Sequence, residues 1–170
     1  MKKLHFLSLI AMTIPFAAAT SCCSDDCNDE NIIERPAEVK IENRHYSIEV
    51  LEALGRVSGP EVSPDGKKVL FNISYENVEQ NKSNNELYVM NIDGTEQVRL
   101  TRTAKSEGGA TWIEDGKRIA FIYADKDGVP QLWVMNADGS DRKCVSNFEN
   151  GVEGFKFSPD SKKVILISTV

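Results

Sequence analysis

Histidine is scarce in this chain of 170 residues, which contains only His5 and His45. Hydrolytic triads need a base, usually a histidine, within hydrogen-bond reach of the nucleophile and oriented by a carboxylate. His5 lies in an apolar N-terminal stretch, and His45 lies among charged and polar residues ahead of the first expected strand. We therefore predict no catalytic residue in this chain.

Cysteine is also rare and unevenly placed. The four cysteines are Cys22, Cys23, Cys27 and Cys144. Three of them are crowded near the N-terminus, which is not the spacing of a disulfide framework. A metal site built on Cys23 and Cys27 would lack two further ligands nearby. We expect no metal and no cofactor, and we expect Cys144 to be a buried or semi-buried strand residue.

Positive charge is in deficit, with 20 lysines and arginines against 26 aspartates and glutamates. The formal charge is −6, and it becomes −8 if Lys2 and Lys3 are removed with the N-terminal segment. No basic stripe with interleaved aromatic residues offsets this charge. We therefore expect no binding to nucleic acid or to anionic lipid surfaces through the protein itself.

The longest apolar run, residues 4–18, is shorter than the roughly 20 residues that span a bilayer. It follows Lys2 and Lys3 and precedes a group of small residues. This layout is typical of a secretory signal peptide, which we place at residues 1–21. A transmembrane anchor is the weaker alternative because of the short apolar run.

The end of this segment, Ala19-Thr-Ser-Cys22, resembles a bacterial lipobox, although Ala19 stands where leucine is usual. We expect Cys22 to become the lipidated first residue of the mature protein. The alternative is a plain cleaved signal peptide followed by a solvated acidic linker. Either pattern predicts an exported protein, and lipidation predicts a periplasmic or outer-membrane lipoprotein, which could also be surface-exposed. The lipid anchor would be its only contact with a membrane.

Residues 22–45 hold few apolar side chains and many charges, so we interpret them as an acidic tether. Residues 46–57 form a lead-in with a short helix predicted at about 47–54. Ser47 is a favoured N-cap residue, and Gly55 is the expected stop signal. A helix of two turns needs packing to persist in water, so its apolar face should cover the first repeat.

The rest of the chain, residues 58–170, is organised by internal repetition. The stretch Glu86–Thr101 recurs forty-five positions later as Gln131–Ser146, and both contain Leu-Tyr/Trp-Val-Met-Asn-x-Asp-Gly. A second phrase, related to Ser-Pro-Asp-Gly-Lys-Lys-Val-Leu-Phe, begins near Ser63, Glu114 and Ser158. Self-similarity at roughly 40–45 residues with several short strands in each unit is typical of a β-propeller array.

Four antiparallel strands in about forty residues make one propeller blade. In the second unit we predict strands at 109–113, 117–124, 131–137 and 142–146, joined by Asp-Gly turns that need a left-handed backbone. We place blades at about 59–103 and 104–148, with a partial blade at 149–170. The predicted fold is therefore all-β, a partial β-propeller of about two and a half four-stranded antiparallel blades with a short N-terminal helix. Closure of a ring needs roughly four to eight blades, so we expect the remaining blades elsewhere and interpret the chain as truncated.

The phrases Ser63–Phe71 and Leu132–Ser140 resemble the repeats of TolB-like propellers. They are also similar to the N-terminal propeller of the prolyl oligopeptidase family, which includes dipeptidyl peptidase IV-like enzymes, and the lead-in Tyr46–Val57 looks more like these peptidases. The resemblance implies a Ser-Asp-His triad on a C-terminal α/β-hydrolase domain with a Gly-x-Ser-x-Gly elbow. This sequence contains no such motif. Its glutamates at 76, 79 and 86 are not a match for the paired glutamates of dipeptidyl peptidases.

Two functions are compatible with these observations. The chain is interpreted first as the non-catalytic propeller portion of an exported serine peptidase, which gates or orients peptide substrates for a hydrolase domain. The alternative is a TolB-like periplasmic propeller that binds a partner protein. The repeats themselves do not single out binding residues.

Overall fold

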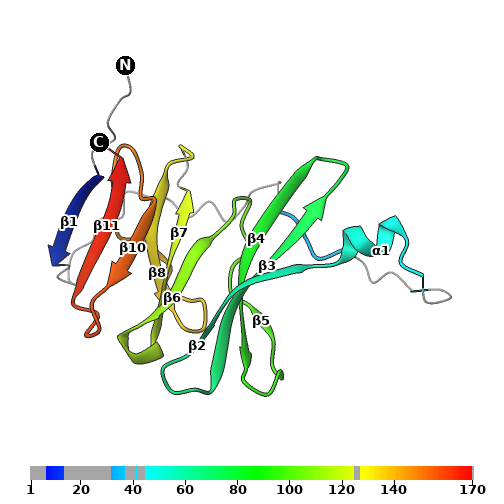
Figure 1. The fold of residues 1–170 in the computed structure, drawn as a ribbon, viewed down its shortest axis with the longest axis horizontal. Helices are drawn as coiled ribbons and strands as arrows, with labels where there is room; N and C mark the ends of the chain where they lie inside the picture. The colour runs from blue at the N-terminus through cyan, green and yellow to red at the C-terminus, as the bar shows by residue number, and fades with distance from the viewer. Residues whose placement is uncertain (1–6, 14–31, 37–40, 42–44, 125–126, 170) are drawn as a thin grey trace.

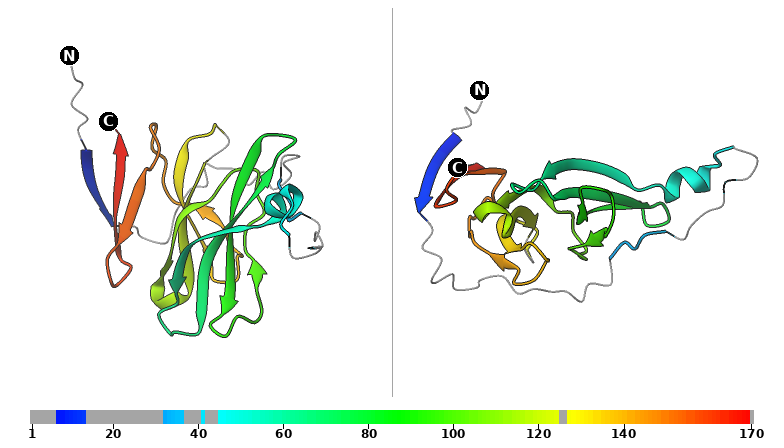
Figure 2. Two further views of the ribbon diagram at one scale, coloured as in Figure 1. Left: turned by 45° about the vertical axis from the view of Figure 1, so that its right-hand side comes forward. Right: turned by 90° about the horizontal axis from the view of Figure 1, so that it is seen from below.

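The computed structural model describes residues 7–13, 32–36, 41, 45–124 and 127–169. In this part of the chain three antiparallel sheets follow one another in a row (Figure 1 and Figure 2). The first contains β2 (Arg56–Val62), β3 (Lys68–Asn77), β4 (Lys82–Asn91) and β5 (Val98–Arg99), in that order. The second contains β6 (Gly108–Ile113), β7 (Arg118–Ala124), β8 (Pro130–Asn136) and β9 (Lys143–Cys144). The third has β11 (Lys163–Thr169) between β10 (Gly154–Phe157) and β1 (Leu7–Thr13). The predicted all-β architecture of partial propeller blades is confirmed.

The repeated sequence forms the same hydrogen-bonded turn in the first two blades. In the first blade the side chain of Asp93 accepts a hydrogen bond from the backbone N–H of Thr95 at 2.9 Å. Asp138 accepts from the N–H of Ser140 at the same 2.9 Å in the second blade. Between each such pair lies a glycine in the left-handed region, for example Gly94 with φ of +86°. The Asp-Gly pairs therefore form the tight turns for which glycine is favoured.

The third blade has Ser161 where the first has Gly66, and Ser161 adopts φ of +53°. A left-handed backbone costs a residue with a Cβ roughly 1–2 kcal/mol. The hydroxyl of Ser161 accepts a hydrogen bond of 2.9 Å from the backbone N–H of Glu114 in the neighbouring sheet. This contact between blades offsets part of the backbone cost, and a glycine could not make it.

Apolar clusters fill the two spaces between neighbouring sheets. The buried members between the first and second sheets are Leu70, Leu87, Val89, Trp112, Ile119, Phe121, Trp133 and Met135. Those between the second and third are Ile113, Ala120, Leu132, Val134, Val152, Val164 and Leu166. Successive residues of β7 thus face opposite neighbours, so both faces of the middle sheet are buried. This explains why the strand shows no alternation with polar residues.

The two outer faces of the row differ. On the first sheet, Phe71 and Tyr88 pack with Ile33, which is buried. Residues 32–36, within the segment expected to be an acidic tether, therefore lie against the propeller. At the opposite end of the row, Ile165 of β11 is 39% exposed. Ile33 packs against one outer face, and the other exposes an apolar side chain.

The helix α1 (Ile48–Ala53) begins after the predicted N-cap. The hydroxyl of Ser47 accepts from the backbone N–H of Val50 at 3.4 Å. Val50 is buried, and α1 contacts β3, as the need for packing predicted. Ile48 and Leu51 are more than half exposed, so only part of the apolar face of the helix is covered.

Gly55 follows the helix for a reason other than the predicted one. It is not in the left-handed region that a glycine stop signal uses. A Cβ at this position would lie 2.6 Å from Cγ2 of Ile73 and 2.9 Å from Cε1 of Tyr75. Glycine is required here because the backbone passes directly over these two side chains of β3.

The strand β1 lies inside the segment expected to be a signal peptide. It pairs antiparallel with β11 from Leu7 opposite Thr169 to Thr13 opposite Lys163, as Figure 1 shows at the outer end of the row. The expected lipidation residue, Cys22, lies outside the described residues. Within the described part of the chain, none of the helices has the length and hydropathy of a bilayer span.

Candidate functional site

The described side chains contain no group of three or more His, Cys, Asp or Glu residues that could hold a metal ion. His45 is exposed on the segment before α1. Cys144 lies on β9 with its side chain half-buried, and its Sγ donates to the carbonyl oxygen of Ser146 at 3.1 Å. The prediction that Cys144 is a strand residue is therefore confirmed.

A groove of about 450 Å³ lies between the first strands of the second and third blades. Its lining includes Trp112 of β6 and both Phe155 and Phe157 of β10. The strand β6 contacts β2 on one side and β10 on the other, so the first strands of the three sheets converge. First strands that converge in this way surround the central channel in a propeller. The groove is thus a concavity on the channel side whose lining mixes aromatic residues with polar and charged ones.

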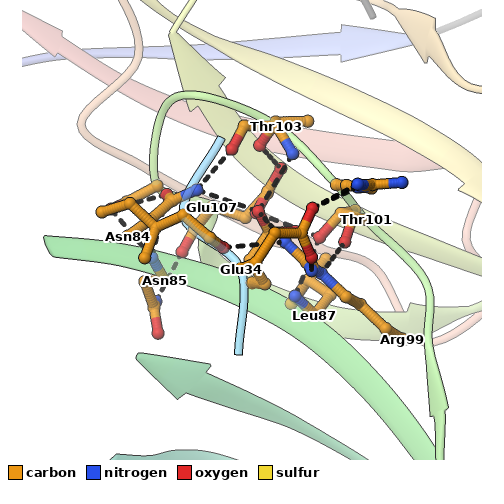
Figure 3. A network of polar contacts seen from close by, with 12 residues as sticks. Glu34, Asn84, Asn85, Leu87, Arg99, Thr101, Thr103 and Glu107 are labelled. Atoms are coloured by element: carbon orange, nitrogen blue, oxygen red, sulfur yellow. Dashed lines mark hydrogen bonds and ion pairs between the residues drawn. The ribbon is translucent and has the colours of Figure 1, made fainter. Parts of the chain in front are cut away.

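A network of buried polar side chains lies where the chain passes from the first blade to the second (Figure 3). Glu86 of β4 is buried and forms an ion pair of 2.9 Å with Nη2 of Arg99 on β5. Its Oε1 also accepts from the backbone N–H of Thr103 at 2.9 Å. Arg99 contacts Glu34 at 3.0 Å through Nη1, which ties residues 32–36 to the blade. A buried carboxylate with this set of partners is fully compensated.

The same scaffold recurs in the second blade without its charge. Gln131 stands where Glu86 stands in the first blade, and it is also buried. Its Oε1 accepts from the backbone N–H of Phe148 at 3.1 Å, in the manner of the Thr103 contact. In both blades, therefore, the side chain at this position accepts a hydrogen bond from a backbone N–H that follows the fourth strand.

The residue next to this position on the fourth strand also differs between the two blades, and its charge changes together with that of the Glu86 or Gln131 position. Arg99 donates from Nε to the carbonyl of Thr101 at 2.8 Å. Cys144, its counterpart forty-five positions later, makes the corresponding contact with Ser146. The blade with a buried glutamate thus has an arginine beside it, and the blade with a glutamine has a neutral cysteine.

Glu107, between β5 and β6, is the second buried acid of the network. Its Oε2 lies 3.1 Å from the hydroxyl of Thr101, and its Oε1 lies 2.6 Å from the hydroxyl of Thr103. Burial, reinforced by the charge of Glu86, raises the pKa of Glu107 to about 8. Arg142 opposes this rise, but its guanidinium is 3.8 Å away, which is too far for a charge-assisted hydrogen bond.

The hydrogen-bond geometry agrees with a neutral Glu107. The hydroxyl of Thr103 lies 2.8 Å from the carbonyl of Lys105, which can only accept. When this hydroxyl donates to Lys105, its oxygen accepts the proton of Glu107. The hydroxyl of Thr101 accepts from the N–H of Leu87 at 2.9 Å and donates its own proton to the other oxygen of Glu107. A protonated carboxyl group therefore satisfies both threonine hydroxyls.

Arg142 crosses the space between the first two blades. Its guanidinium carbon lies 4.2 Å from the ring centroid of Tyr123, 5.0 Å from that of Trp133 and 5.2 Å from that of Phe121. Cation–π contacts of this kind are worth about 2 kcal/mol when desolvated. These three rings of the second blade thus hold the Arg142 guanidinium, and its Nη2 lies 3.8 Å from Glu107.

The described contacts of the network join residues 32–36, the first blade and the second blade. They fix the relative position of the blades. This network was not predicted from the sequence. Aligning the repeats indicates only its Glu86–Arg99 part, because these two residues change together to Gln131 and Cys144.

Comparison with known proteins shows the family to which the chain belongs. Residues 37–170 match the sequence model of the TolB beta propeller domain. The chain belongs to this family. The TolB-type propeller of this chain is 43% identical over 126 residues to dipeptidyl-peptidase 5 of Porphyromonas gingivalis, covering 74% of the chain and 18% of that protein. The whole chain is 29% identical over 167 residues to dipeptidyl-peptidase 5 of Porphyromonas endodontalis, covering 98% of the chain and 23% of that protein.

A solved structure shows the same fold at low sequence identity. The acylaminoacyl peptidase of Pyrococcus horikoshii aligns with a TM-score of 0.56 and 19% identity, covering 69% of this chain and 18% of that one. The TolB-type propeller described here therefore spans less than a quarter of the length of either dipeptidyl-peptidase. The expected resemblance to TolB-like and peptidase propellers is confirmed.

Proposed function

We propose that this chain is the non-catalytic propeller portion of an exported serine peptidase of the prolyl oligopeptidase family. In this role it gates or orients peptides for a hydrolase domain outside these 170 residues. The observation that carries the proposal is the 43% identity over 126 residues to a dipeptidyl-peptidase, of which those residues are a minor part. The scarcity of histidine supports a non-catalytic role for this portion.

The groove on the channel side is where we propose that peptide passes. Phe155 and Phe157 pack edge to face, with ring centroids 5.9 Å apart, and offer apolar surface to a side chain. The exposed Lys156 between them supplies a positive charge, and Glu114 and Asp115 supply negative charges on the same lining. An extended peptide could also pair with the free edge of a first strand, because main-chain hydrogen bonds bind any sequence. Such a site would select for extended peptides more than for particular residues.

A serine-hydrolase probe tests this proposal. An epitope tag placed in the exposed turn at residues 78–80 would mark the protein expressed from its own gene, and a fluorophosphonate probe would label any active serine. We expect the tagged protein to react with the probe and the isolated 170-residue chain not to react. Labelling of the isolated chain, or a tagged protein that never reacts, would contradict the proposal.

The family match favours one alternative, a TolB-like periplasmic propeller that binds a partner protein. The same experiment separates the two. In the alternative, the tagged protein ends within one propeller, does not react with the probe and co-purifies with another protein. The coding sequence after codon 170 gives an independent answer, since a peptidase needs a Gly-x-Ser-x-Gly elbow and a later histidine.

We also propose that the chain is exported by the signal peptide at residues 1–21 and anchored by a lipid on Cys22. The positive start at Lys2 and Lys3, the apolar run and the lipobox-like residues support this proposal. An anchored propeller would lie in the periplasm or at the outer membrane.

A further inference from the structure

The strand β1 occupies the place in the third sheet that third strands occupy in the other two. In the first blade β4 pairs antiparallel with β3, and in the second β8 pairs with β7. In the third sheet β1 pairs antiparallel with β11, and β10 takes the other edge. The register is also the same, since a methionine stands opposite the equivalent residue each time. These pairs are Val69–Met90, Ile119–Met135 and Val164–Met12.

The sequence of β1 is a partial copy of the repeated phrase. Leu9-Ile-Ala-Met-Thr13 aligns by register with Leu87-Tyr-Val-Met-Asn91 and with Leu132-Trp-Val-Met-Asn136. Leucine stands at the first position and methionine at the fourth in all three. A small or β-branched apolar residue is third, and a polar residue ends the strand. The N-terminal apolar segment therefore has the pattern that this fold uses for a third strand.

We propose that the outer edge of β11 is a strand-acceptor site and that Leu7–Thr13 is its occupant while the N-terminal segment remains on the chain. Seven consecutive residue pairs align along this edge. An unpaired edge strand presents a row of N–H and C=O groups that bind another extended segment. The inference rests on backbone register and so does not depend on the proposed peptidase function.

The binding of β1 gives the N-terminal segment a second role. While it lies along β11, that edge of β11 is paired, β1 becomes the outermost strand of the sheet, and the segment is held in a strand. Removal of residues 1–21 would open the edge for another strand. The same edge can therefore hold either the leader or a later third strand, but not both.

A cross-link tests the register in the full chain, produced without export so that residues 1–21 remain. The four native cysteines are replaced by serine, and Ala11→Cys is combined with Ile165→Cys, which stands directly opposite. Opposed residues have Cβ atoms about 5 Å apart, within reach of dibromobimane. We expect an adduct within one molecule for this pair. The control pairs Ala11→Cys with Ile167→Cys, two positions out of register, and should form little adduct.

Three outcomes of this test would overturn the proposal. These are no adduct with either pair, equal adduct with both pairs, or adduct only between two molecules. Hydrogen exchange gives a second measurement that does not need the cross-link. Proline at both Ile10 and Ala11 removes a ladder donor whichever of the two residues faces β11.

In the proline variant we expect amides of β11 to exchange at least about tenfold faster than in the parent chain, while amides of β7 are unchanged. A control with proline at Ala17 and Ala18, beyond the end of β1, should leave β11 protected. Unchanged exchange of β11 in the Ile10 and Ala11 variant would show that the leader is not its occupant.

Discussion

Replacing Glu107 by glutamine tests the buried network directly. In the folded protein the carboxyl group is neutral up to about pH 8 because burial and the charge of Glu86 raise its pKa. Glutamine has nearly the same shape, and its amide can donate to Thr103 and accept from Thr101 as the neutral acid does. The substitution therefore removes the ionisation and keeps the hydrogen bonds.

The size of the effect follows from linkage between proton binding and folding. In the unfolded chain Glu107 ionises near its ordinary pKa of 4.5. Between pH 4.5 and about 8 the folded state holds a proton that the unfolded state has lost, so the free energy of unfolding falls as pH rises. Each tenfold difference in proton affinity is worth about 1.4 kcal/mol, so the whole window corresponds to about 5 kcal/mol. That is a large part of the roughly 5–15 kcal/mol that stabilises a typical domain.

Urea unfolding followed by tryptophan fluorescence, measured from pH 5 to pH 9, would show this difference. We expect the glutamine variant to gain stability over the parent chain steadily with pH, by several kcal/mol at pH 9 relative to pH 5. Glu149→Gln, at an exposed position, should follow the parent curve. If Glu107 were instead ionised and paired with Arg142, the glutamine variant would lose stability at pH 7. A constant or declining difference would refute the neutral carboxyl group.

Three further results are expected. Arg99→Cys should cost about 3 kcal/mol or more in urea unfolding, because it leaves Glu86 buried without its cation. Adding Glu86→Gln should restore much of this loss, since the pair then matches the second blade; no recovery would contradict the match. Gly55→Ala should cost about 1–3 kcal/mol through its clash with β3, whereas Gly108→Ala, with open space around its Cβ, should change the unfolding midpoint little. Cys22→Ser should abolish incorporation of labelled palmitate into the exported chain, and persistent labelling would place the lipid elsewhere.

The fold could be predicted because its determinants are local and repeated. The repeated phrase carries its own turn residues, so Asp93 and Asp138 make the same contact in both blades. The N-cap at Ser47 was also readable from neighbouring residues.

The network and the leader strand were not predicted, because both depend on residues far apart in the chain. Arg142 meets Glu107 only after two blades have packed together, and no local pattern marks that pair. The apolar segment at Leu7–Thr13 was interpreted by its composition alone, and its pairing with β11 depends on an edge at least 150 positions away. Gly55 was expected at a helix end for its conformational freedom, whereas its role is steric.

The covering of one outer face by Ile33 has a consequence for assembly. Equivalent residues of the middle strands, such as Phe71, Phe121 and Leu166, all face the preceding neighbour, so contacts between blades are directional. Directional contacts are heterologous, and between separate molecules they continue into filaments unless a ring closes. A second copy that added to the face beside Ile165 would have to present the first-blade face that Ile33 already fills. Ile33, in the segment expected to be an acidic tether, thus covers part of the face that such a copy would need.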